Sequence, residues 1–149
     1  MKSRPGYTLI ELLIYISIVS IALIVFMNFM TDVSRNAARF RVAKDVSQNA
    51  RIVMDSITRD VRNASSVTVP NSNTLSLQVG GNPVQYALSG NAVMYNATPL
   101  TSSNLSSALT FAVQNNEVSV HLVVSSTNSG TPSTTTLDTV VIPRQQLYL

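Results

Sequence analysis

Glu11 is the only carboxylate or base within a long apolar run, Tyr7–Met30. A charged side chain costs roughly 2.5–3.5 kcal/mol at the centre of a membrane helix, and less near an end, so such a carboxylate is a functional candidate. Two roles fit its position. Thr8 and Glu11 have the spacing of a capping box, in which the two residues satisfy the first amides of a helix. Alternatively, Glu11 pairs with a positive charge on another molecule.

A short basic peptide precedes the apolar run. Pro5 disfavours the helical conformation at Arg4, and Gly6 is a poor helix former, so a helix does not readily extend back past Tyr7. A protease could bind this extended peptide at the membrane face. The sequence therefore favours either a plain single-pass anchor or a segment that is cleaved before its apolar run.

The length of the run argues against an ordinary secretory signal peptide. As a helix, Tyr7–Met30 would extend about 36 Å, enough to cross a hydrocarbon core of about 30 Å. A signal peptide has an apolar region of only about 7–15 residues, followed by a small-residue cleavage site. Here the run continues into Asn28-Phe29-Met30-Thr31-Asp32 with no such site.

The segment Gly6-Tyr7-Thr8-Leu9-Ile10-Glu11-Leu12-Leu13, behind the basic leader Lys2-Ser3-Arg4-Pro5, closely resembles the prepilin cleavage and methylation motif of type IV pilins and type II secretion pseudopilins. The resemblance implies cleavage after Gly6 by a prepilin peptidase and N-methylation of Tyr7, where Phe is commoner. It also implies that Glu11 pairs with the N-terminal amine of a neighbouring subunit, since a buried carboxylate and a buried ammonium are tolerable together.

Two further features concern the subtype. No Gly or Pro bends the apolar run, and Asn28 stands where many major pilins carry Pro, which favours a minor pilin or pseudopilin. The stretch from Ile57 to Ala64 resembles the same region of J-type minor pseudopilins. The resemblance implies a bacterial inner-membrane precursor with its leader in the cytoplasm and its head outside, later part of a pilus or pseudopilus. The implied partners are the peptidase/methyltransferase, other pilin or pseudopilin subunits and, before assembly, membrane lipid.

The elements that must present this N-terminus read as an α+β protein with four parts: a leader at 1–6, an apolar helical half at 7–30, an amphipathic half at 31–64 and a β-rich head at 65–149. Apolar residues recur at helical spacing from Val33 to Ala64, which predicts one helix from about Thr8 to about Asn63 with its Arg and Asp residues, Asp60 among them, on the solvated face. The apolar stripe predicts an antiparallel sheet packed on it.

Short β-branched and apolar runs, separated by turn residues, predict the strands of the head. They are Val67–Val69, Thr74–Val79, Val84–Leu88, Ala92–Tyr95, Leu109–Val113, Val118–Ser125 and Asp138–Ile142. The sequences Gly80-Gly81-Asn82, Ser89-Gly90-Asn91 and Gln114-Asn115-Asn116 are tight-turn sequences that predict hairpins. Polar loops are expected over Thr98–Ser107 and Thr127–Thr136.

The composition gives no sign of catalysis. The chain has no cysteine and one histidine, and beyond Asn63 its only charged residues are Glu117, Asp138 and Arg144. His121, in an alternating run, is expected to face solvent. We predict no enzymatic activity, no metal site and no cofactor. The net charge of +3, of which the leader supplies two, is too small to indicate nucleic-acid binding.

The sequence therefore predicts a structural subunit, a minor pilin or pseudopilin of a type IV pilus or type II secretion pseudopilus, that assembles through its N-terminal helix. The alternative is an uncleaved single-pass membrane protein with an extracytoplasmic β-rich binding or adhesion domain, in which Glu11 is only a cap.

Overall fold

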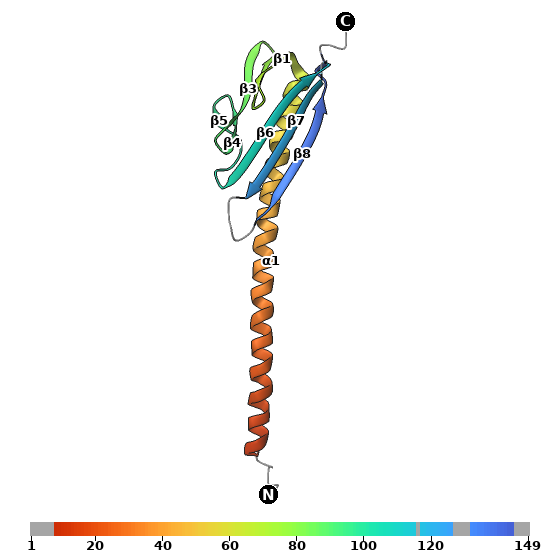
Figure 1. The fold of residues 1–149 in the computed structure, drawn as a ribbon. Helices are drawn as coiled ribbons and strands as arrows, with labels where there is room; N and C mark the ends of the chain where they lie inside the picture. Colours follow the sequence, from red (N-terminus) through yellow and green to blue (C-terminus); the bar gives the residue numbers. More distant parts are fainter. Residues whose placement is uncertain (1–7, 116, 127–131, 145–149) are drawn as a thin grey trace. The chain divides into compact units, whose positions relative to one another are not determined.

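One long helix and two antiparallel sheets make up the computed structural model, which describes residues 8–115, 117–126 and 132–144 (Figure 1). The helix α1 spans Leu9–Asn63, which confirms the predicted helix almost to the residue. By internal contacts the chain divides into two compact units, Met1–Ala38 and Arg39–Leu149. The fold is α+β and pilin-like, as the sequence predicts.

The first unit contains the apolar part of α1. Its large apolar side chains are exposed, from 46% at Met30 to 79% at Leu9. The hydroxyls in this stretch bond to the helix itself: Ser17 Oγ donates to the Leu13 carbonyl at 2.8 Å, and Ser20 Oγ donates to the Ile16 carbonyl at 2.7 Å. These hydroxyls are therefore satisfied without water, which suits an apolar environment.

The second unit holds α1 from Arg39 onward and all the strands. The strands are β1 (Ala64–Asn71), β2 (Thr74–Val79), β3 (Asn82–Ser89), β4 (Ala92–Tyr95), β5 (Thr98–Pro99), β6 (Leu105–Gln114), β7 (Glu117–Ser126) and β8 (Thr134–Val141). β1 to β5 form one sheet in sequence order, and β6, β7 and β8 form a second, with antiparallel pairing throughout.

The predicted turns join the strands as expected. β2 and β3 meet at Gly80 and Gly81, and β3 and β4 at Gly90, all with positive φ, a conformation that glycine adopts without steric cost. The third predicted turn joins β6 to β7; its Asn115 also has positive φ, whereas Asn116 lies outside the described residues.

The two predicted polar loops are partly wrong. Thr98–Ser107 contains the short strand β5 and the beginning of β6, and the end of Thr127–Thr136 belongs to β8. Residues 127–131 lie outside the described part of the chain. Runs of Ser and Thr suggest loops in a sequence, but here neighbouring strands supply the backbone partners that hold them in sheets.

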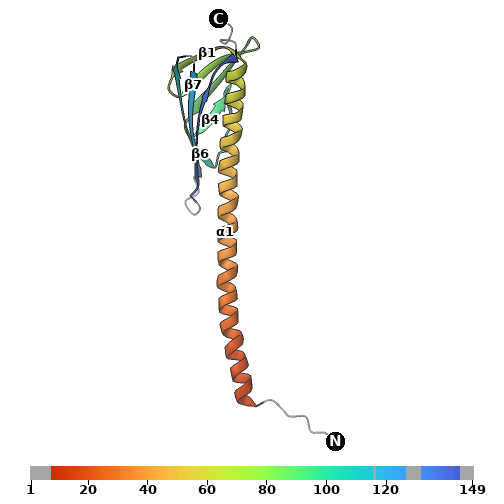
Figure 2. The same cartoon turned by 90° about the vertical axis from the view of Figure 1, so that its right-hand side faces the viewer.

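A single core joins the helix to both sheets (Figure 2). From α1 it receives Val46, Ala50, Val53, Met54, Ile57 and Val61, spaced at three and four residues along one face. In β7 alternate residues are buried, so Val118, Val120, Leu122 and Val124 face the core while Ser119 and His121 face outward. The sheet that the apolar stripe predicts is therefore present.

Asp60 corrects one expectation. The sequence predicts it on the solvated face of the helix, but only 9% of its surface is exposed. Asp60 follows the buried Ile57 by three residues and precedes the buried Ala64 by four, so it lies on the apolar stripe. Its charge led to the expectation of a solvated position, whereas its spacing from Ile57 and Ala64 places it on the buried face of the helix.

Candidate functional site: the N-terminal helix

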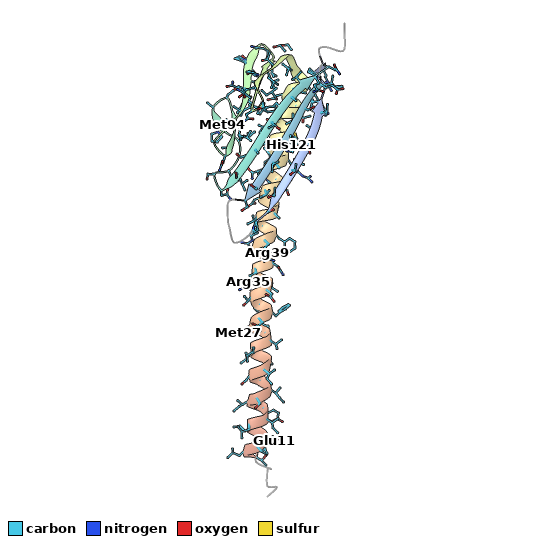
Figure 3. The ribbon with its side chains drawn as sticks, viewed as in Figure 1. Glu11, Met27, Arg35, Arg39, Met94 and His121 are labelled. Carbon is cyan, nitrogen blue, oxygen red and sulfur yellow. The ribbon has the colours of Figure 1, made fainter. Side chains whose placement is uncertain are left out.

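The start of α1 places Glu11 in its first turn (Figure 3). The Glu11 amide donates to Thr8 Oγ1 at 3.4 Å, and the Leu12 amide donates to the Thr8 carbonyl at 3.2 Å. Thr8 is therefore the N-cap residue, and its side chain accepts one of the two hydrogen bonds of a capping box. The negative charge of Glu11 is also favourable near the positive end of the helix dipole.

The remaining predicted site residues, Gly6 and Tyr7, lie outside the described residues, so the structure does not test their roles. Within residues 8–115, 117–126 and 132–144, no group is hydrogen-bonded to the Glu11 carboxylate. Glu11 is half-buried between exposed neighbours. The pairing of Glu11 with an amine on another subunit stays a prediction.

The helix beyond Glu11 presents apolar side chains on all sides. Ile14, Ile16, Val19 and Ile24 are each more than half exposed, and their spacing directs them to different sides of the helix. A helix that is apolar all round is stable when lipid or other protein surrounds it. By length and composition this helix can cross a membrane.

A buried polar cluster lies in the second unit. The Tyr86 hydroxyl donates to Asp60 Oδ2 at 2.7 Å and lies 2.8 Å from Ser56 Oγ, which therefore donates to it. Burial raises the pKa of Tyr86 above its ordinary value, and the Asp60 carboxylate adds to the rise. Arg59 Nε also approaches Asp60, at 3.5 Å. The cluster joins the helix to β3 through a satisfied polar network, so we assign it to stability.

His121 faces solvent, as predicted (Figure 3). Its Nδ1 pairs with Asp138 Oδ1 on the neighbouring strand β8. A shallow hollow of about 450 Å³ lies beside the pair, on the outer face of the sheet. Among the described residues, no three His, Cys, Asp or Glu side chains gather closely enough to hold a metal ion. The sequence had no signal for the pairing of His121 with Asp138, because strand register decides it.

Comparison with known families identifies the N-terminus. The model of the prokaryotic N-terminal methylation motif matches residues 1–27. This is the prepilin-type motif of type IV pilin-like proteins. The matched region contains Gly6, Tyr7 and Glu11 and ends within the apolar part of α1. The chain has no significant match among curated proteins or solved structures. The motif and the apolar helix together indicate a protein anchored in the inner membrane.

Proposed function

We propose that the protein is a structural rather than a catalytic subunit, a minor pilin or pseudopilin that is processed as a prepilin and assembled into a filament through α1. The observation that carries the proposal is the methylation-motif match at residues 1–27, which overlaps the start of a long helix whose apolar side chains are exposed. Such a surface is stable in lipid and also against copies of itself, so one helix can serve as membrane anchor and then as filament core.

In this proposal, the peptidase cuts after Gly6 and the new N-terminal amine, on Tyr7, is methylated. The amine of one subunit then pairs with the Glu11 carboxylate of its neighbour. Each charge alone is costly in an apolar environment, so pairing them favours one axial position of neighbouring helices over others. The proposal leaves open whether the filament is a pilus or a secretion pseudopilus.

Mass spectrometry of the N-terminus tests the processing step directly. Co-expressed with its native peptidase, the wild-type chain is expected to begin at N-methylated Tyr7. Gly6→Val is expected to keep Met1, since a β-branched side chain replaces the glycine at the cut, while Ser3→Val serves as a control that leaves the cut intact. A wild-type chain that retains Met1 supports the alternative, an uncleaved anchor with a binding head.

The role of Glu11 is tested separately. Glu11→Ala is expected to insert in the membrane and to be cleaved, but to be depleted from isolated filaments relative to wild type. Glu11→Asp keeps the charge and recovers part of the incorporation. Normal incorporation of Glu11→Ala would leave the carboxylate with its capping role only.

A further inference from the structure

Strand β8 is the outer strand of the three-stranded sheet, and no described element lies beyond it (Figure 1). The edge of a sheet presents unpaired backbone N–H and C=O groups that pair readily with another chain. Folded proteins therefore protect their edges with bulges, prolines, charges, short strands or covering segments.

The five-stranded sheet protects both of its edges. At one edge, the pairing of β1 with β2 shifts register twice, and β1 contains Pro70. At the other edge, β5 consists only of Thr98 and Pro99. Bulges, proline and a very short strand all oppose the addition of a further strand.

In the three-stranded sheet, the edge formed by β6 is covered. The Ser107 amide donates to the Asn91 carbonyl at 2.8 Å, and the Phe111 amide donates to the Ser72 carbonyl at 2.7 Å. Both acceptors belong to turns of the other sheet. These contacts leave little of the β6 edge available to a partner.

β8 lacks the bulges, prolines and covering turns that protect the other edges. It pairs with β7 in a regular register over its whole length, without a bulge, and contains neither Pro nor Gly. Its only charged residue is Asp138, which is already paired with His121. Thr and Val, which favour extended structure, supply most of the strand. Among the edges of the described sheets, β8 alone has the features of a strand that is ready to pair.

The hydrogen-bonding pattern shows which backbone groups are available. The Phe111 amide points away from β7, so in β6 the even-numbered residues bond to β7. Alternation then directs the even-numbered residues of β7 toward β8, which agrees with the bond from the Ser126 amide to the Ser133 carbonyl at 2.8 Å. The backbone groups directed away from β7 are therefore those of Thr134, Thr136, Asp138 and Val140.

We propose that the free edge of β8 binds an extended segment of a different protein, which adds as an antiparallel fourth strand with a Lys or Arg opposite Asp138. The charges of the sheet support a basic partner: Glu117 and Asp138 lie in the described parts of β6, β7 and β8, which contain no Lys or Arg. An added strand would also cover Leu137, which faces the core but is only half-buried at this edge. Main-chain bonds would supply affinity, and the alternating side chains specificity.

A second copy of the chain is a poorer occupant. Among the described strands β8 is the only open edge, so two copies would pair their β8 strands about a two-fold axis perpendicular to the sheet. The helix packs along one face of the sheet (Figure 2). This two-fold axis would therefore make the two helices run in opposite directions, with their Arg39 ends at opposite ends of the dimer. Two subunits anchored in one membrane cannot adopt this arrangement, an exclusion that rests on the proposed function.

The test uses the full-length chain in detergent micelles and a short synthetic peptide in which Val and Thr alternate around a central Lys. Placed on β8, its valines face the core and its Lys lies opposite Asp138. Binding is measured by fluorescence anisotropy, and amide hydrogen exchange locates it. We expect exchange at Thr136, Asp138 and Val140 to slow by at least ten-fold when the peptide is bound, with no change in β1 or β5.

Matched peptides separate strand pairing from other modes of binding. N-methylation of the Thr and Lys amides, which face β8, is expected to abolish binding. N-methylation of the Val amides, which face away, is expected to preserve it. In the protein, Thr136→Pro removes an amide that bonds to nothing in β7, so it should block the peptide while the head stays folded; Thr136→Val is its control.

Asp138→Asn tests the charge. It should weaken binding of the Lys peptide by roughly 1.5- to 5-fold, the range expected for a cross-strand ion pair. Binding of a peptide with norleucine in place of the Lys should not change. Glu117→Gln is the matched control and should leave the binding of both peptides unchanged.

Equal binding of the two N-methylated peptides overturns the proposal. So does slow exchange along β8 that depends on protein concentration and needs no peptide, because a second copy would then occupy the edge. N-terminal processing is measured independently, so failure here leaves the proposed function standing.

Discussion

The two parts of α1 use the same kind of side chain in opposite ways. Ile18, in the apolar part, is 59% exposed, whereas Ile57, in the amphipathic part, is 0% exposed in the core of the head. Both are isoleucines within one uninterrupted helix. The difference is that two sheets pack around Ile57, while no described residue of the first unit packs over Ile18. The head is therefore stable by its own packing, and the apolar part depends on its surroundings.

The largest expected effect is the loss of stability when the buried Ile57 is truncated. Ile57→Ala removes the side chain from a closely packed core and should lower the free energy of unfolding of the head by about 2–5 kcal/mol. Ile18→Ala removes the same atoms from the apolar part and should change the free energy of unfolding of the head by less than about 0.5 kcal/mol. Chemical unfolding of the full chain in detergent, followed by hydrogen exchange in β7, measures both. Equal effects would mean that the two units unfold together.

The second prediction concerns the exposed apolar part of α1. Ile18→Asp places a second carboxylate in the apolar part and should disfavour membrane insertion by about 3 kcal/mol. Gln48→Asp, at an exposed position in the amphipathic part, should leave insertion unchanged. The fraction of chain that resists alkaline extraction from membranes gives the result. If Ile18→Asp inserts as well as wild type, the apolar part does not lie in the membrane.

A smaller effect is expected where the helix and sheet meet through polar groups. Tyr86→Phe removes the hydroxyl that donates to the buried Asp60, and should destabilise the head by about 1.5–3 kcal/mol. Tyr95→Phe is the matched control, because it keeps the ring that packs edge-on against Tyr86 at a centroid distance of 5.2 Å. Equal stability of the two variants would show that the Asp60 bond contributes nothing.

The same hydroxyl predicts a dependence on pH. Because the pKa of Tyr86 is raised in the folded head, the unfolded chain releases this proton first. The stabilisation is therefore fully present below the ordinary tyrosine pKa of about 10 and declines as the pH rises above it. We expect the alkaline decline in unfolding free energy to be shallower in Tyr86→Phe than in Tyr95→Phe. Equal slopes would assign the decline to other groups.

The sequence was most informative where a single periodicity covers many residues. The helical spacing from Val33 to Ala64 predicted one continuous helix, which α1 confirms, and the turn sequences at Gly80 and Gly90 predicted two hairpins, in which both glycines have positive φ. The N-terminal motif was equally readable, because Gly6 stands just before a long apolar run and Glu11 stands at a fixed offset within it. These features are local, so no partner strand or distant contact is needed to define them.

Tertiary structure decided what depends on residues far apart in the chain. The buried Asp60 has a hydrogen-bond donor because Tyr86 of β3 reaches it, and His121 has an acidic partner because strand register places Asp138 opposite it. The order of the strands likewise left β8 at an open edge while the turns of the other sheet covered β6. Periodicity along the chain assigns each residue to a face of its own element. Only packing between elements determines what that face meets.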